Sequence, residues 1–239
     1  MILPKQLLAI TRGAFVKGHI ALIGGDEFRL GCEPMDRQIL AATGLERPSM
    51  LLVPTAAATQ NPLRAVEDGK KYFSGLGADV SKLMVLDATD ANDEALLSSV
   101  DHADIVYLTG GDPIYLLKAL RGSALLTKMI RALSLGAILV GSSAGAMVLG
   151  SWMRPKKWRP GLGVIPRIAV FPHHECVDPD AVSRKLTRSA PDSLIVLGID
   201  AGTGCLGCQE GWRVIGLGGV TVYRSGVWTR YSSGDLIHI

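Results

Sequence analysis

The chain has 239 residues, 48% of them apolar, with 25 lysines and arginines against 22 aspartates and glutamates. This length and composition suit one large α/β domain with a substantial core. The formal net charge of +3 is too small for a general nucleic-acid or membrane-surface binder, so any preference for a charged partner must be local.

Short apolar runs alternate with longer amphipathic segments along the chain. The runs expected to be buried strands are His19–Gly24, Met50–Pro54, Leu83–Leu86, Ile105–Thr109, Ala137–Val140 and Leu194–Ile199. The expected helices are Pro34–Ala42, Pro62–Leu76, Asp93–Val100, Pro113–Leu120, Ala124–Leu135 and Pro179–Arg188. After residue 203, short β-prone pieces predict antiparallel hairpins at the edge of the sheet, at Trp212–Leu217, Val220–Tyr223 and Val227–Tyr231.

This order of elements predicts the α/β class, with three layers in which helices cover both faces of a mainly parallel sheet. No internal repeat, low-complexity tract or linker is evident, so we expect residues 1–239 to form a single domain. In such a sheet the catalytic groups gather at the carboxyl ends of the strands.

The N-terminal residues lack the apolar core and small-residue cleavage site of a secretory signal, and four cysteines do not make the dense framework of a small secreted domain. We therefore expect a cytoplasmic protein with reduced thiols. The stretch from Ala132 to Met153 has no charged side chain and is long enough to span a bilayer. Its four glycines and the Ser142-Ser143 pair favour a buried strand, a tight turn and a buried helix instead, so no membrane partner is expected.

A tight turn at Gly141–Gly145 carries the strongest catalytic signal. Its sequence, GSSAG, matches the G-x-S-x-G nucleophile elbow and follows a predicted strand. Small residues allow a strained turn that lifts the Ser143 hydroxyl above the sheet edge, so Ser143 is the candidate nucleophile. The alternative is a Gly/Ser-rich loop that only packs tightly or binds a phosphate at the start of a helix.

Four sequence blocks resemble peptidase family S51, which contains aspartyl dipeptidase and cyanophycinase. They are Ile20–Asp26 (IALIGGD), Tyr107–Leu117 (YLTGGDPIYLL), Gly141–Met147 (GSSAGAM) and, similar to the cyanophycinase branch, Val196–Thr203 (VLGIDAGT). The resemblance implies a flavodoxin-like fold of the class I glutamine amidotransferase type, with serine in place of the cysteine of those enzymes.

The resemblance implies that the amides of Gly111 and Ala144 form an oxyanion hole. Two glycines before Asp112 allow an amide to face outward, although a plain strand-to-helix turn capped by Asp112 would look the same. Pro113 stands where cyanophycinases usually carry a glutamine, so polymer-type specificity is not implied.

The resemblance also implies His173 as the general base, after the strand-like run Ile168–Phe171. The sequence leaves the identity of the orienting acid open, because Ala201 occupies the position of the acid in cyanophycinase-like members. Glu175 is the first candidate, since H-x-E spacing in an extended segment puts both side chains on one face. Asp200 is the alternative acid.

Further substrate contacts are expected from Asp112 and His174, and from Arg154 and Arg159 in a cationic loop after the nucleophile helix. These cations either select an acidic substrate or belong to a solvated loop. The CxxC motif of Cys205–Cys208 has no second paired motif, so we expect no metal, and no cofactor is implied.

The sequence therefore predicts a serine peptidase that hydrolyses a small peptide or isopeptide amide, with aspartate next to the scissile bond, through an acyl-enzyme on Ser143. One alternative is a catalytically weakened or inactive homologue that acts as a binding protein. Another is an esterase or an amidotransferase-like enzyme. No nucleic-acid partner is expected, and the oligomeric state, a homodimer included, is left open.

Overall fold

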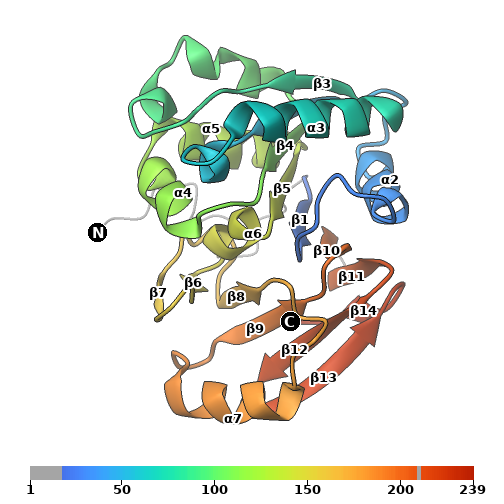
Figure 1. Cartoon of the computed structure of the whole chain (residues 1–239), viewed down its shortest axis with the longest axis vertical. Coiled ribbons are helices and arrows are strands. Elements are labelled where there is room, and N and C mark those ends of the chain that lie inside the picture. Colours follow the sequence, from blue (N-terminus) through green and yellow to red (C-terminus); the bar gives the residue numbers. More distant parts are fainter. Residues whose placement is uncertain (1–17, 209–210) are drawn as a thin grey trace.

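The computed structural model describes residues 18–208 and 211–239, and two β-sheets form its framework (Figure 1). The strand order of the larger sheet is β14-β11-β10-β1-β5-β4-β2-β3. Its strands are β1 (Ile20–Ile23), β2 (Ser49–Val53), β3 (Asp79–Lys82), β4 (Ile105–Leu108), β5 (Ile138–Ser142), β10 (Thr203–Cys208), β11 (Gly211–Gly216) and β14 (Leu236–Ile237). The strands from β1 to β3 in this order are parallel, as predicted, and β10, β11 and β14 add antiparallel partners at one edge.

A smaller sheet lies in the lower half of Figure 1 and has the order β13-β12-β9-β8. Its strands are β8 (Ile168–Phe171), β9 (Ile195–Ile199), β12 (Gly219–Arg224) and β13 (Val227–Ser232). The predicted strand at Leu194–Ile199 therefore pairs with β8 and β12 rather than within the large sheet, and the β12–β13 hairpin extends this second sheet. A short hairpin of β6 (Trp152–Met153) and β7 (Arg159–Pro160) lies between the turn at Ser143 and β8 along the chain.

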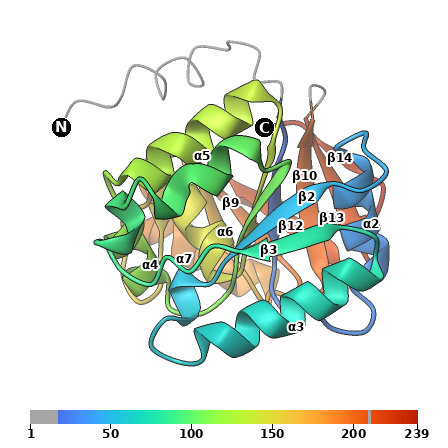
Figure 2. The same ribbon diagram turned by 90° about the horizontal axis from the view of Figure 1, so that it is seen from above.

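Helices cover both faces of the large sheet, with α3 and α5 on opposite sides of it (Figure 2). The helices are α2 (Glu33–Ala41), α3 (Pro62–Gly75), α4 (Pro113–Leu120), α5 (Ala124–Leu135), α6 (Ala144–Leu149) and α7 (Pro179–Ser189), with short 3₁₀ turns η1 (Thr55–Ala57), η2 (Asp90–Asn92) and η3 (Leu96–His102). Side chains of β1 alternate between two cores, because Ala21 and Ile23 pack with α2 and α3 whereas Leu22 packs with α4, α5 and α6. Within the described residues, no helix combines the length and the apolar character needed to cross a bilayer.

Two expected elements differ in the structure. The strand expected at Leu83–Leu86 is found directly before those residues, as β3 at Asp79–Lys82. Only Val80 of β3 is buried, because β3 is the edge strand of the large sheet. Leu83 and Val85 are buried in the core without forming a strand, which explains the misleading apolar run. The helix expected at Asp93–Val100 is the 3₁₀ turn η3, which begins three residues later.

The carboxyl group of Asp36, in α2, is buried beside Tyr72 of α3. The hydroxyl of Tyr72 donates to Asp36 Oδ2 at 2.8 Å, and Oδ1 of Asp36 is buried without a partner among the described residues. Burial, with smaller contributions from Glu33 and Glu27, raises the pKa of Asp36 to about 7. Near neutral pH the Asp36 carboxyl therefore gains and loses a proton inside the core.

Because the pKa of Asp36 is raised by burial, we expect the free energy of unfolding to depend on pH. The pKa of Asp36 is raised in the folded state, so the protonated carboxyl contributes to the free energy of unfolding. This contribution is complete below about pH 4 and is lost progressively as the pH rises to about 7. An Asp36→Asn variant should lose most of this decline, which is on the order of a few kcal/mol. Urea unfolding at pH 5 and pH 8 measures it, and equal declines in both proteins would show that Asp36 is not the titrating group.

Candidate active site

Ser143 occupies a strained turn between β5 and α6. Its backbone has φ 46° and ψ −103°, and its amide donates to the carbonyl of Ile23 at 2.9 Å. A Cβ atom added at Gly141 would lie 2.6 Å from the carbonyl carbon of Gly145, and one at Gly145 would lie 2.5 Å from the oxygen of Leu108. Only glycines fit these two positions, so the local sequence fixes this sharp turn at the sheet edge.

His173 approaches the same point from the end of β8. Its Nε2 atom lies 3.3 Å from Ser143 Oγ, and its amide donates to the carbonyl of Gly24 at 2.9 Å. The imidazole lies directly against Gly25, where an added Cβ atom would be 2.2 Å from Cε1 of His173. The structure thus brings together the serine and the histidine that the sequence singled out, at hydrogen-bonding distance.

The loop after β4 lies beside this pair. Gly111 has φ 139°, and a Cβ atom there would lie 2.2 Å from the carbonyl oxygen of Ala56, so this position also requires glycine. Ala144 is the first residue of α6, and the first amide of a helix has no carbonyl of its own helix to bond. Asp112 caps α4 by accepting from the amides of Ile114 and Tyr115, at 2.7 and 3.1 Å. Its carboxylate is therefore occupied by the helix start.

Glu27 is a site residue that the sequence analysis missed. One carboxylate oxygen accepts from the amide of Gly110 at 2.7 Å and the other accepts from the hydroxyl of Ser142. Glu27 thereby joins the turns that follow β1, β4 and β5. The signal that could have revealed it is an acidic pair, Asp26-Glu27, directly after the first predicted strand, at the edge where functional side chains collect.

The two candidate orienting acids have other partners in the structure. Glu175 is exposed, and its Oε2 atom accepts from the amide of Ala201 at 2.9 Å. Asp200 is 3% exposed and forms a salt bridge with Arg230 at 2.5 Å. Among the residues that the structure describes, neither carboxylate hydrogen-bonds to His173. The structure therefore shows a serine and a histidine without an acid on the imidazole.

The side chain of His174 is buried against the smaller sheet. It is 3% exposed, its Nε2 atom lies 2.7 Å from the hydroxyl of Tyr223, and burial lowers its pKa. His174 is not among the residues that line the cleft around Ser143. The adjacent histidines thus divide into one exposed at the cleft and one buried, so the expected substrate contact of His174 has no geometric support.

An open cleft of about 940 Å³ contains Ser143, His173 and Gly111. Its charged lining consists of Asp26, Glu27, Arg29, Arg64, Asp68 and Lys71. Arg29 pairs with Asp26 at 3.7 Å and Arg64 with Asp68 at 3.5 Å, whereas Lys71 pairs with no carboxylate among the described residues. Lys71 is therefore the cation of the cleft that remains available to a bound anion.

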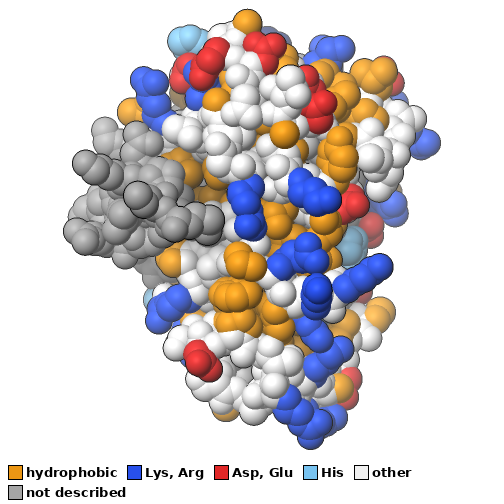
Figure 3. All heavy atoms as spheres, turned by 90° about the vertical axis from the view of Figure 1, so that its left-hand side faces the viewer, with side chains coloured by type: hydrophobic (Ala, Val, Ile, Leu, Met, Phe, Trp, Pro, Cys, Tyr) orange, Lys and Arg blue, Asp and Glu red, His pale blue; other side chains and the backbone are white. Residues whose placement is uncertain are grey.

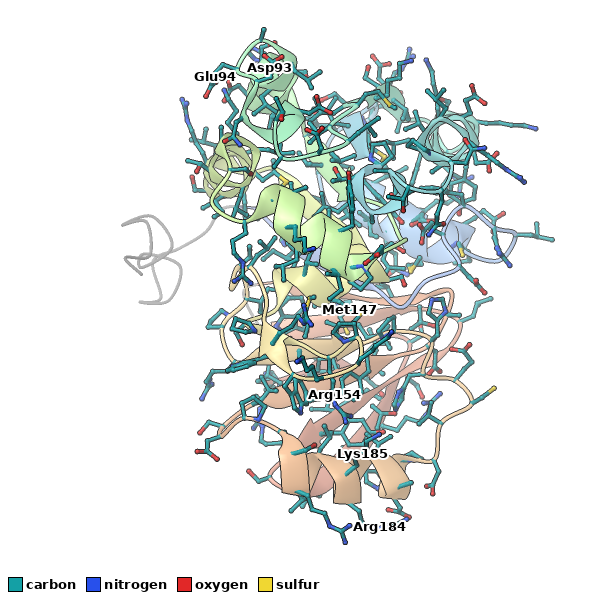
Figure 4. The ribbon with its side chains drawn as sticks, turned by 60° about the vertical axis from the view of Figure 1, so that its left-hand side comes forward. Asp93, Glu94, Met147, Arg154, Arg184 and Lys185 are labelled. Carbon is teal, nitrogen blue, oxygen red and sulfur yellow. The ribbon has the colours of Figure 1, made fainter. Side chains whose placement is uncertain are left out.

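Arg154 and Arg159 lie outside this lining, on the β6–β7 hairpin (Figure 4). The guanidinium carbon of Arg154 is 5.7 Å from the ring centroid of Trp158. These arginines are therefore not positioned next to the scissile bond of a substrate at Ser143. Within the described residues, no group of three histidine, cysteine or acidic side chains could hold a metal, and the side chain of Cys208 lies outside them.

The sequence of the chain is similar to those of known peptidases and cyanophycinases. The sequence profile of peptidase family S51 matches residues 20–214. A cyanophycinase of Synechococcus elongatus is 30% identical over 245 residues, which cover 92% of this chain and 73% of the relative. The uncharacterized peptidase Lin0382 of Listeria innocua is 29% identical over 106 residues, covering 44% of this chain and 49% of that protein.

Solved structures of peptidases have a similar fold. A crystal structure of a peptidase from an acI-B1 Actinobacterium has a TM-score of 0.80 and 26% sequence identity, covering 93% of this chain and 97% of that one. A putative peptidase E protein from Listeria monocytogenes EGD-e has a TM-score of 0.64 at 17% identity, covering 84% and 98%. The second likeness concerns the fold alone.

The contact between Gly25 and His173 generates a prediction. A Gly25→Ala variant would place a methyl group 2.2 Å from Cε1 of His173 and should displace the imidazole, so labelling of Ser143 by a fluorophosphonate should fall at least a hundredfold with the fold retained. Gly75→Ala is the matched control, because a Cβ atom there meets nothing within 4 Å. Undiminished labelling of the Gly25→Ala variant would show that the position of His173 does not govern Ser143.

Proposed function

The chain belongs to peptidase family S51, and from that premise we propose that it hydrolyses a peptide or isopeptide amide through an acyl-enzyme on Ser143. The observation that carries this proposal is the 3.3 Å approach of Ser143 Oγ to His173 Nε2 at a strained turn in an open cleft. A nucleophile needs a base at this range to take its proton.

The proposed mechanism has two halves. In the first, Ser143 Oγ attacks the amide carbonyl as its proton passes to His173 Nε2, and the amides of Gly111 and Ala144 stabilise the resulting oxyanion. The imidazolium then donates its proton to the departing amine, which leaves an ester on Ser143. In the second half, His173 takes a proton from water as the water oxygen attacks the ester, and the imidazolium then returns that proton to Ser143 Oγ as the acid is released.

In this proposal Ser143 and His173 act without a carboxylate hydrogen-bonded to the imidazole. In the serine-protease triad, replacing the orienting acid lowers turnover by about 10⁴. Here the backbone bond to Gly24 and the close contact with Gly25 hold the imidazole instead. A slow peptidase is therefore the leading candidate. The missing acid favours one second candidate, an inactive homologue that binds peptides without cleaving them.

The substrate proposal follows from the cleft. Lys71 is the cation that would pair with an aspartate beside the scissile bond, because Arg29 and Arg64 already have acidic partners. A cytoplasmic location and a single domain over residues 1–239 stay predictions, and the oligomeric state, a homodimer included, stays open.

Replacing the two adjacent serines tests the proposed nucleophile. Ser143→Ala should abolish both fluorophosphonate labelling and hydrolysis with the fold intact, because it removes the attacking oxygen. Ser142→Ala removes a hydrogen bond to Glu27 but no reacting atom, and should cost less than about tenfold. Mass spectrometry of the labelled chain and peptide turnover measure both effects. Equal losses in the two variants would contradict the assignment of Ser143.

A second substitution tests whether the pair acts alone. Glu175→Gln should lower turnover by less than about tenfold, because the amide oxygen of glutamine can still accept from Ala201 and no bond to His173 is lost. Asp200→Asn weakens the salt bridge with Arg230 and should lower the melting temperature more than the turnover per folded molecule. A loss of several orders of magnitude in Glu175→Gln would instead make Glu175 the orienting acid during catalysis.

A further inference from the structure

Charge is unevenly distributed along the chain. From Pro113 to His174 there is no aspartate or glutamate, whereas the same segment contains nine lysines and arginines. This segment includes the nucleophile turn, the β6–β7 hairpin and β8. Lys128 and Arg131 of this segment pair with acids of other elements, whereas four of the nine cations lie close together on the β6–β7 hairpin.

These cations contribute to a basic surface in the lower half of the molecule, where Figure 3 shows lysines and arginines gathered on one face. We define the basic surface by Arg154, Lys156, Lys157 and Arg159 of the hairpin together with Arg184 and Lys185 of α7. Figure 4 labels Arg154, Arg184 and Lys185 in this half. In the described part of the chain, no salt bridge involves any of the six.

The hairpin also contains buried donors that have no acceptor. Nε of Arg154, Nε1 of Trp158 and Nε of Arg159 are buried without a hydrogen-bond partner, and in the described residues only Asp36 contributes another such atom. Among the described residues none supplies an acceptor to these three donors, so they are available to an acceptor from outside the chain.

The hairpin is attached to the elements that carry the candidate catalytic pair. The ring of Trp158 stacks on Phe171, with centroids 5.9 Å apart and an angle of 27°. Phe171 is the last residue of β8, two positions before His173, and β6 begins three residues after α6 ends. The hairpin therefore packs against the strand that leads into His173, but it lies outside the lining of the cleft around Ser143.

We propose that the hairpin binds a carboxylate of an acidic segment of the polypeptide substrate, beyond the residues that occupy the cleft around Ser143. This inference rests on the proposed function and adds a second contact region to it. Arginine presents a planar fork that matches a carboxylate, and the indole N–H of Trp158 adds a third donor. The exposed Lys156, Lys157, Arg184 and Lys185 would then attract further acidic side chains.

The charges that line the cleft fit a polypeptide better than a nucleic acid. The cleft beside Ser143 is lined by three acids and three cations, and of these cations only Lys71 lacks an acidic partner among the described residues, so the cleft offers one contact to an anion and no track for a chain that carries a phosphate at every residue. A peptide with a single aspartate beside the scissile bond and further acidic residues along the chain meets both environments. A dipeptide would not reach the hairpin, so the site favours longer substrates.

Binding to the Ser143→Ala protein tests the inference without catalysis. The probes are a fluorescein-labelled peptide of four alanines followed by four glutamates, the same peptide with glutamines, and a labelled dT12 oligonucleotide. Fluorescence anisotropy should show at least tenfold tighter binding of the glutamate peptide than of the glutamine peptide. Addition of the glutamate peptide should shift the indole N–H resonance of Trp158 in a ¹H–¹⁵N spectrum, identified by its loss in Trp158→Phe.

Two hairpin variants and one control in the same background locate the binding site. Lys156→Gln with Lys157→Gln changes only exposed side chains and should weaken glutamate-peptide binding at least fivefold. Trp158→Phe keeps an aromatic ring on Phe171 and removes one donor, and should also weaken binding. Arg37→Gln with Arg47→Gln neutralises two exposed cations in and just after α2 and should leave binding unchanged.

Three results would overturn the inference: equal binding of the glutamate and glutamine peptides, equal effects of the hairpin and control variants, or tighter binding of dT12 than of the glutamate peptide. None of them depends on hydrolysis. Failure of the proposed function would appear separately, as absence of Ser143 labelling in the wild-type protein.

Discussion

Two consecutive carbonyls at the end of β1 hold the backbone of both candidate catalytic residues. The carbonyl of Ile23 accepts from the amide of Ser143, and the carbonyl of Gly24 accepts from the amide of His173. Ser143 and His173 are 30 positions apart and follow strands of different sheets, yet this one strand end holds both. The pairing of β1 with β5 in the large sheet is thus the constraint on which the geometry of the cleft depends.

The elements that could be predicted from the sequence are those specified by local pattern. Apolar runs gave the parallel strands, and prolines at helix starts gave α3, α4 and α7. The turn at Ser143 was visible because glycines stand where neighbouring backbones come too close for a side chain. The family resemblance also holds, since the S51 profile matches residues 20–214.

Other features depend on contacts between distant segments, which local pattern does not contain. Glu27 reaches Gly110 and Ser142 across 83 and 115 positions. The partner of Glu175 is the amide of Ala201, and H-x-E spacing could not distinguish that amide from the imidazole of His173. Likewise, the alternation of Val80 with exposed neighbours in the edge strand β3 was hidden by the stronger apolar run at Leu83–Leu86.

The contact with Gly25 has a consequence for the proton on His173. Packing fixes where the imidazole lies, but within the described residues no acceptor fixes which ring nitrogen is protonated. A neutral imidazole exists as two tautomers, and only the form with the proton on Nδ1 leaves Nε2 free to accept from Ser143. A carboxylate on Nδ1 would select that form, as in the serine-protease triad. Steric fixation alone leaves the folded molecules divided between a competent and an incompetent tautomer.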